Sequence, residues 1–311
     1  MDTLIDIVRP NIAVLTTIGI SHREFFNSEK EIAVEKGKLA AALPADGVYV
    51  YNLDDAHVAA QTGRTSARLF SYGKAGFASE KADVVLQSVE EQLHIPPATN
   101  LSIQTPSGTV NISIPVIGTA HESAVLAAVA VAEAMEVDPD QYTKGLSTYR
   151  AVPGRLNLIA GIKKTILIDD SYNAAPLSTI EALQLLSRFD NPTKIAVLGD
   201  MLELGDSADE AHKEIGKLVA ELNLSQLVTV GSLGKIIAES AAGAGMQPDK
   251  IVSYDTSDVA ASAVLGSLHP ESAILIKGSQ GARMEKITKE LMAEPTAATQ
   301  LLVRQYGKWV E

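Results

Sequence analysis

The feature that most constrains the fold of this chain is a repeated pattern. Short apolar runs lead directly into polar segments, most of which contain glycine. Four such segments follow predicted buried strands: TTIGISH (16–22), DDSYNA (169–174), GDMLELG (199–205) and KGSQGAR (277–283). A buried strand that ends in polar residues and leads into a helix is typical of an open α/β sheet, which presents ligands at the carboxyl ends of its strands. We therefore predict an α/β protein whose functional residues lie in these four segments.

The first half of the chain predicts a strand–helix–strand unit followed by a hairpin. The predicted strands are 12–15 and 47–51, and the helix between them spans 28–43 with Ser28 as its N-cap. A helical connection of this length favours a parallel pair of strands. Further on, two alternating segments flank Thr105-Pro106-Ser107-Gly108 and predict a β-hairpin. We expect a mostly parallel sheet with a hairpin region.

The second half predicts another open α/β sheet. Its strands share an apolar, β-branched composition, and helices separate them: 165–168, 195–198, 227–230 and 274–276. Pro153 and Gly154 interrupt the pattern between the two halves. We therefore predict two domains, 1–152 and a Rossmann-like domain at 153–311.

Composition excludes several classes of function. The net charge is −12 and the pI is about 5.0, which argues against a nucleic-acid partner because such partners require many Lys and Arg contacts to phosphate. The chain has no cysteine, so thiolate chemistry and disulfides are excluded. No apolar run approaches the roughly 20 residues of a membrane span, and the N-terminus has no basic signal region. We expect a cytoplasmic monomer.

The sequence motifs in the polar segments resemble those of one protein family. PGRL at 153–156, DDSYNAxP, LGDMLELG and KGSxxxRME occur in the order typical of the Mur ligases, which are ATP-dependent amide-bond ligases of peptidoglycan synthesis. Residues 9–290 can be laid on the pattern of that family. Within it, the resemblance is strongest to the branch that adds D-Ala-D-Ala to UDP-N-acetylmuramoyl-tripeptide. The resemblance implies a Mur central ATPase domain, truncated at its N-terminus, followed by the C-terminal domain.

The family resemblance implies a reaction in two steps that uses ATP and Mg²⁺. A substrate carboxylate attacks the γ-phosphate to form an acyl phosphate, and an amine then displaces phosphate. Such phosphoryl transfer depends mainly on positioning and on cations that neutralise the phosphate oxygens. The implied substrates are a UDP-N-acetylmuramoyl-peptide and D-Ala-D-Ala or another amino acid.

The family pattern also assigns candidate site residues. It implies that His22 contacts a second metal ion and that Lys36, carried as a carbamate, bridges the metals, so both are candidates for catalytic and metal-binding roles. The remaining candidates are polar residues in the segments after strands: Arg155, Asp170, Asn173 and Asn52 for nucleotide, and Asp200, Glu203, Lys277 and Ser279 for the incoming amine substrate. His212 fits a helix of the family and is expected to be structural.

Two departures from the family pattern stand out. The phosphate-binding string G-x-x-x-x-G-K-[ST] is absent, and Gly231–Ile236 has the wrong glycine spacing. In the segment 118–124, His121 and Ala124 occupy positions where the family usually has Asn, which puts adenine recognition in question. We therefore expect the chain alone to be inactive.

Three alternatives stay open. A folylpolyglutamate- or cyanophycin-synthetase-like ligase shares the same core, and a non-catalytic binding module derived from a Mur ligase would tolerate the missing loop. A nicotinamide-dependent oxidoreductase is disfavoured because no G-x-G-x-x-G follows the first strand of either domain.

Overall fold

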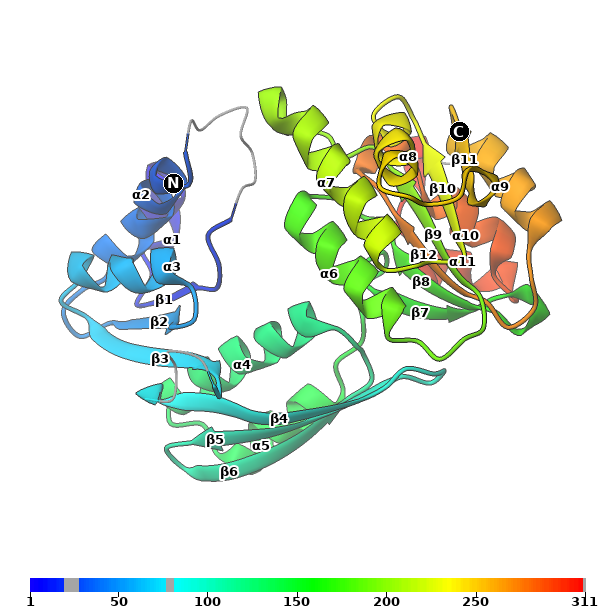
Figure 1. Ribbon diagram of the computed structural model, residues 1–311. Coiled ribbons are helices and arrows are strands. Elements are labelled where there is room, and N and C mark those ends of the chain that lie inside the picture. The colour runs from blue at the N-terminus through cyan, green and yellow to red at the C-terminus, as the bar shows by residue number, and fades with distance from the viewer. Residues whose placement is uncertain (20–27, 77–80, 310–311) are drawn as a thin grey trace. The chain divides into compact units, whose positions relative to one another are not determined.

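The computed structural model describes residues 1–19, 28–76 and 81–309 and shows two compact units (Figure 1). The first unit comprises residues 1–92 and 98–150, and the second comprises 93–97 and 151–311. The predicted boundary after residue 152 lies two residues from this division. Residues 93–97, which we expected in the first domain, group with the second unit.

The first unit contains a six-stranded sheet whose strands lie in sequence order. The strands are β1 (Ile12–Leu15), β2 (Val48–Asn52), β3 (Arg68–Lys74), β4 (Val84–Gln92), β5 (Ala98–Thr105) and β6 (Gly108–Ile114). Strands β1 to β4 pair in parallel, whereas β4, β5 and β6 pair antiparallel. The expected mostly parallel sheet with a hairpin region is therefore confirmed.

Five helices are described in this unit: α1 (Asp2–Val8), α2 (Glu29–Ala41), α3 (Ala56–Ala59), α4 (Thr119–Ala134) and α5 (Pro139–Ser147). Three of them, α2, α3 and α5, begin at a residue whose side chain caps the helix. The Ser28 hydroxyl accepts a hydrogen bond from the Glu31 amide at 3.2 Å, as predicted for the N-cap of α2. Asp138 caps α5 in the same way, and Pro139 occupies its first turn.

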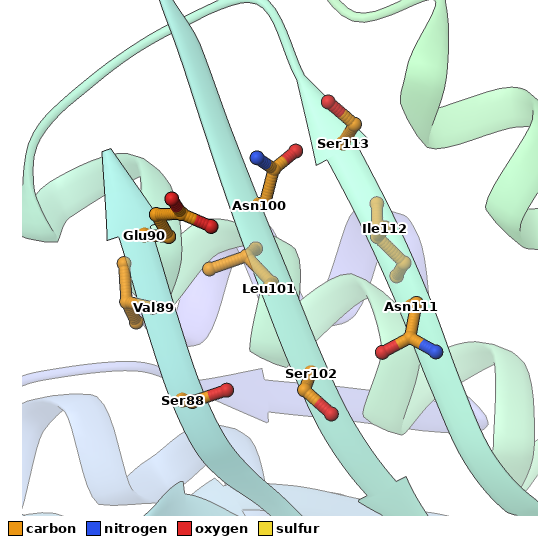
Figure 2. A pocket seen from close by; sticks show the side chains of 9 residues that line it. All are labelled: Ser88, Val89, Glu90, Asn100, Leu101, Ser102, Asn111, Ile112 and Ser113. Carbon is orange, nitrogen blue, oxygen red and sulfur yellow. The ribbon is translucent and has the colours of Figure 1, made fainter. Parts of the chain in front are cut away.

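The hairpin strands show clear alternation between a buried and a polar face. Leu101, Ile103 and Ile112 are buried, while Ser102 lies beside Asn111 and Asn100 beside Ser113 on the other face. Figure 2 shows these polar side chains around a shallow pocket over β4, β5 and β6. This is the pattern of an antiparallel sheet with one solvated face.

The second unit contains a doubly wound sheet. Its strands are β7 (Asn157–Ala160), β8 (Ile166–Asp170), β9 (Lys194–Gly199), β10 (Gln226–Val230), β11 (Ile251–Tyr254) and β12 (Ala273–Lys277), in the spatial order β11-β10-β9-β12-β8-β7. Only the edge strand β7 is antiparallel among these described strands. Because β12 lies between β8 and β9, the carboxyl ends of these three strands are neighbours. Ligands bind at such reversals of strand order.

Helices cover both faces of this second sheet. They are α6 (Pro176–Ser187), α7 (Ala208–Glu221), α8 (Gly234–Gly243), α9 (Ser257–Ser267), α10 (Glu285–Leu291) and the short α11 (Ala298–Leu301). Helices α9 and α10 pack on one face through a continuous apolar core, and α6, α7 and α8 form the other layer (Figure 1). Within the described ranges, the longest apolar helices are too short to traverse a bilayer.

We expect Gly216 to be essential for the packing of α7 on α8. A Cβ at this position would lie 2.4 Å from the Ile237 carbonyl oxygen and 2.6 Å from the Ser240 Cβ. Gly216→Ala should therefore lower the free energy of unfolding by about 1–3 kcal/mol in urea titrations. The control is Gly243→Ala in α8, where a Cβ meets nothing within 4 Å and helix propensity should raise stability by up to about 1 kcal/mol. Equal effects of the two changes would contradict the close packing.

Candidate functional site

A buried ion pair lies at the carboxyl edge of the second sheet. Strands β8 and β12 pair so that Asp170 is in register with Lys277, and parallel register places both side chains on the same face. The Lys277 Nζ lies 2.5 Å from the Asp170 Oδ2, and the Lys277 side chain is only 2% exposed. Lys277 also donates to the Asn173 carbonyl oxygen at 3.1 Å. The predicted nucleotide residues Asp170 and Asn173 are therefore held by the predicted substrate residue Lys277.

This arrangement changes how Lys277 is interpreted. We predicted that its ammonium binds the carboxylate of the incoming substrate, and that role stays a prediction. In the structure the ammonium is already neutralised by Asp170. A buried charge requires such a partner, because removal of one member of a buried pair typically costs 3–5 kcal/mol. Lys277 thus orders the segment after β8.

The segments after β9 and β12 are joined to each other. The Ser279 amide donates to the Asp200 carbonyl oxygen at 2.9 Å, and the Ser279 hydroxyl accepts from the Leu202 amide at 2.8 Å. The Asp200 Oδ1 accepts from the Gly234 amide at the start of α8, at 2.8 Å. Glu203 is exposed and adopts a left-handed conformation with φ of 64°. Asp200 and Ser279 are therefore neighbours, and Glu203 lies exposed in the loop that follows Asp200.

A pocket of about 350 Å³ opens beside Asp200 on this edge. Its lining combines residues from the loops after β9, β10, β11 and β12: Asp200, Leu202, Val230, Gly231, Asp255, Thr256, Ser257, Asp258, Gly281, Ala282, Arg283 and Lys286. Three carboxylates and two cations therefore border one cavity. A lining with both signs of charge suits a small zwitterion better than a simple anion.

The PGRL turn binds the segment after β8. The Gly154 carbonyl oxygen accepts from the Tyr172 amide at 3.1 Å, and the Asp170 Oδ1 accepts from the Leu156 amide at 3.3 Å. Gly154 has φ of +72°, and a Cβ there would lie 2.9 Å from the Tyr172 nitrogen, so the turn requires glycine. The Arg155 guanidinium lies 4.2 Å from the centroid of the Tyr172 ring. Arg155 and Asp170 thus belong to one cluster.

Asp169, the neighbour of Asp170, is fully buried on the opposite face of β8. Its Oδ1 accepts from the Thr288 hydroxyl of α10 at 3.0 Å. Burial raises the pKa of Asp169 to about 6; the carboxylates of Asp170 and Glu285 add to the rise, while the hydroxyls of Ser171 and Thr288 oppose it. Asp169 is therefore a buried acid that titrates near neutral pH.

In the first unit, the segments after β1 and β2 meet. The Asn52 Nδ2 donates to the Thr16 carbonyl oxygen at 3.0 Å, and the Lys36 Nζ donates to the Thr17 carbonyl oxygen at 3.4 Å. Asp55 joins them, because its Oδ2 accepts from the Ile18 amide at 2.8 Å and from the Thr17 hydroxyl at 3.0 Å. We did not select Asp55 as a site residue from the sequence, although it lies in the loop between β2 and α3. These oxygen-rich groups suit Mg²⁺ and phosphate chemistry.

The neighbouring lysines of α2 differ in their partners. Lys38 forms ion pairs with Asp2 at 2.6 Å and with Glu35 at 2.8 Å, and the hydrogen bonds that it donates to these carboxylates raise its pKa. A carbamate forms only on a neutral amine, so Lys38, which these carboxylates keep as an ammonium, is disfavoured as the carbamate site. The predicted His22 lies outside the described residues. In the described ranges, no three His, Asp or Glu side chains are grouped as a ready metal site.

Two histidines outside the predicted metal loop are buried. The His121 Nδ1 lies 3.2 Å from the Tyr149 hydroxyl, so this departure from the family's usual Asn is packed into the first unit. The His212 Nε2 accepts from the Met201 amide at 2.9 Å, and its Nδ1 lies 2.6 Å from the Ala208 carbonyl oxygen. His212 thus fixes the loop after β9, in agreement with the structural role we expected.

Together these features define a two-unit α/β protein with polar sites at the carboxyl edges of both sheets. The Mur ligase middle domain matches residues 2–132, and the glutamate ligase domain of Mur ligases matches residues 154–280. The chain therefore belongs to the Mur ligase family.

Relatives of known activity extend the comparison. The UDP-N-acetylmuramoyl-tripeptide–D-alanyl-D-alanine ligase of Bacillus subtilis is 31% identical over 95% of this chain and 62% of its own length. The Escherichia coli ligase of the same name is 28% identical over 94% of this chain and 62% of its own length. The chain thus spans about three fifths of these relatives.

Solved structures show the same fold. MurF from Acinetobacter baumannii has a TM-score of 0.80 and 29% identity, with coverage of 93% of this chain and 61% of its own. MurF ligase from Thermotoga maritima in complex with ADP has a TM-score of 0.78 at 22% identity, with coverage of 92% and 62%.

The buried Asp169 should give a characteristic pH dependence. Between pH of about 4 and 6 the folded chain keeps the proton of Asp169, whereas the unfolded chain, with a pKa of about 3.9, has lost it. The contribution of Asp169 to stability therefore falls as pH rises through this window, by at most about 1.4 kcal/mol per pH unit, and is level above it. Asp169→Asn removes this term.

The measurement is urea unfolding of both proteins from pH 4 to pH 8. The stability of Asp169→Asn relative to wild type should rise up to pH of about 6 and then stay constant. A difference that does not vary with pH would show that Asp169 titrates normally.

Proposed function

We propose that this chain supplies the ATP-handling and amine-binding units of a ligase that joins D-Ala-D-Ala to UDP-N-acetylmuramoyl-tripeptide. The reaction would pass through an acyl phosphate, in the cytoplasm, on a monomer. The observation that carries the proposal is the pocket beside Asp200, whose lining combines carboxylates with Arg283 and Lys286. The names of the relatives supply the substrates.

The pocket favours a dipeptide with a free amine. In the proposed pose the dipeptide ammonium points to Asp200 and its carboxylate to Arg283, because charge-assisted hydrogen bonds are the strong ones. Asp200 Oδ1 is engaged by the Gly234 amide, which fixes the carboxylate at the edge of the pocket, and Oδ2 would receive the ammonium. Arg283 would offer the dipeptide carboxylate the N–H groups of its guanidinium that Glu285 and the Trp309 carbonyl oxygen do not use.

Each unit offers groups of its own for nucleotide chemistry: the cluster around Asp170 in the second unit, and the groups around Lys36 in the first. Arg155, whose guanidinium is oriented by Tyr172, would contact phosphate, and Asn173 would contribute beside it. In the first unit, Asn52, Asp55 and the Thr16 and Thr17 carbonyl oxygens provide the oxygen-rich surroundings that Mg²⁺ prefers. Bound Mg²⁺ would neutralise charge on the transferred phosphate, and His22 and a Lys36 carbamate would help hold it.

The ligase reaction tests the proposal directly. In the full-length protein, phosphate release from ATP is expected only when UDP-N-acetylmuramoyl-tripeptide and D-Ala-D-Ala are both present. N-acetyl-D-Ala-D-Ala, which has no ammonium, should bind at least about tenfold more weakly in calorimetry. Phosphate release with folate and glutamate instead would assign the chain to the folylpolyglutamate branch.

The variant Asp200→Asn tests the role of the Asp200 negative charge without removing the hydrogen-bond acceptor that the fold uses. It keeps an oxygen for the Gly234 amide but removes the negative charge, so the preference for the free dipeptide over its N-acetyl form should disappear. The stability of the variant should stay near that of wild type. If the preference survives, the dipeptide ammonium binds elsewhere.

The two lysines of α2 provide a matched test for the carbamate. With ¹³C-labelled bicarbonate, a carbamate carbon signal should be present in wild type and in Lys38→Met but absent in Lys36→Met, because Lys38 is held as an ammonium by Asp2 and Glu35. Loss of the signal in Lys38→Met would show that the carbamate forms on Lys38, and would contradict our assignment to Lys36.

A further inference from the structure

The C-terminal segment from Leu302 to Trp309 packs within the second unit, beyond the part that matches the glutamate ligase domain. The match to the glutamate ligase domain ends at residue 280. Leu302 is buried in the apolar core of the unit, and the Arg304 side chain is only 5% exposed. From the sequence we could assign no role to this tail. Its contacts, however, go to residues next to the proposed site.

Arg304 binds the main chain of the segment after β8. Its Nη2 donates to the Ser171 carbonyl oxygen at 2.5 Å, and its Nη1 donates to the Tyr172 carbonyl oxygen at 3.3 Å. These two residues lie between Asp170 and Asn173 and include the ring on which Arg155 stacks. One side chain from the tail thus fixes two successive peptide groups of the proposed nucleotide segment.

Glu285 connects Arg304 to a second arginine. The Glu285 side chain is 0% exposed, and its Oε2 lies 2.9 Å from the Arg304 Nη2. Its Oε1 lies 2.6 Å from the Arg283 Nε. A fully buried carboxylate requires such partners, so the two guanidinium groups are held together by one acid.

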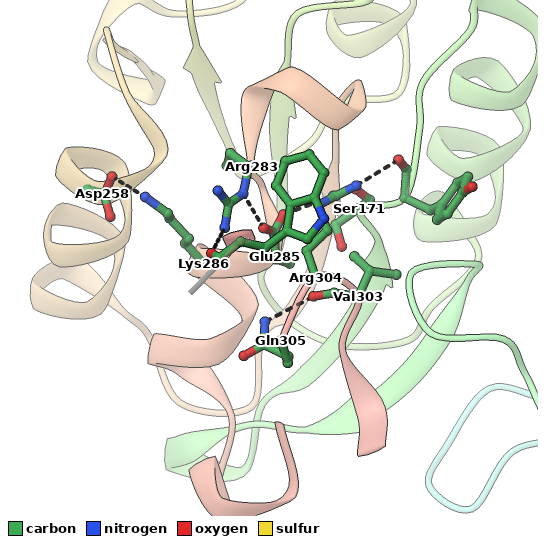
Figure 3. Close-up of polar contacts among 10 residues, drawn as sticks. Ser171, Asp258, Arg283, Glu285, Lys286, Val303, Arg304 and Gln305 are labelled. Atoms are coloured by element: carbon green, nitrogen blue, oxygen red, sulfur yellow. Dashed lines mark hydrogen bonds and ion pairs between the residues drawn. The ribbon is translucent and has the colours of Figure 1, made fainter. Parts of the chain in front are cut away.

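Trp309, at the end of the tail, also contacts Arg283 and helps to fix its guanidinium. The Arg283 Nη2 donates to the Trp309 carbonyl oxygen at 2.6 Å, and its guanidinium lies 5.1 Å from the centroid of the Trp309 ring (Figure 3). Arg283 also lines the pocket beside Asp200. With one nitrogen held by Glu285 and another by Trp309, its direction is restricted.

We propose that the segment 302–309 is a positioning element of the site: Arg304 fixes the Ser171–Tyr172 main chain, and Trp309 with Glu285 fixes the Arg283 guanidinium at the pocket. What the pocket receives rests on the proposed function. The positioning itself depends on contacts within the second unit. A guanidinium that is oriented before binding loses less entropy when a carboxylate arrives, so the tail contributes to affinity without touching the ligand.

Trp309 makes the proposal measurable, because it is the sole tryptophan of the chain. Arg304→Met should release the tail, shift Trp309 emission to longer wavelength and raise its acrylamide quenching about twofold. Amide exchange at residues 171–173 should become about tenfold faster, while exchange in β9 and β10 stays unchanged. Arg304→Lys keeps a charge opposite Glu285 and should restore part of the protection. Tyr306→Ala, in the same tail with 77% exposure, is the control and should change none of these.

The affinity for D-Ala-D-Ala shows whether the tail positions Arg283 for binding or only packs against the second unit. In Arg304→Met the Kd for D-Ala-D-Ala should rise about tenfold, and Arg304→Lys should recover part of this loss. Faster exchange throughout the second unit, or unchanged exchange at 171–173, would overturn the proposal, as would an unchanged Kd despite a released tail. If wild type binds no D-Ala-D-Ala, the proposed function fails, and the tail proposal is then decided by exchange at 171–173 and by Trp309 quenching alone.

Discussion

The buried ion pair between Asp170 and Lys277 is the interaction on which the second unit's site depends. Parallel pairing of β8 with β12 forces the two side chains to the same face, and the low exposure of Lys277 leaves it no solvent to compensate its charge. Hydrogen bonds made by both members of this pair then hold the neighbouring main chain in place. Lys277 holds the Asn173 carbonyl oxygen, and Asp170 holds the Leu156 amide of the PGRL turn.

Much of the fold could be predicted from the sequence because the apolar runs are short, buried and β-branched. Strand β9 and strand β12 are examples, since every residue from Ile195 to Gly199 and from Ala273 to Lys277 is buried. Strands β4 and β7 were missed, and so were β3 and β11, whose burial shows why. Arg68 and Leu69 of β3 are exposed, and β11 at the sheet edge is only partly buried, so neither gives a continuous apolar signal.

The site was predictable in its location but less so in its contacts. Positions at the ends of strands selected Asp170, Asp200 and Lys277 as site residues, because an open α/β sheet presents ligands at the carboxyl ends of its strands. The sequence could not indicate that Lys277 pairs with Asp170, since that depends on strand order and register. Glu285 and Arg304 were missed for a related reason: a helical glutamate and a tail arginine have the composition of solvated surface, and burial alone distinguishes them.

The place of β12 in the sheet has a consequence for how the site is assembled. Asp170 and Lys277 are separated by 107 residues, and β12 enters between β8 and β9 after every other strand of that sheet has been made. Until then β8 and β9 have unpaired edges that are prone to aggregation, and the closure of so long a loop slows folding. The loops after β8, β9 and β12 therefore come together only when β12 docks, so binding competence in this unit depends on that pairing.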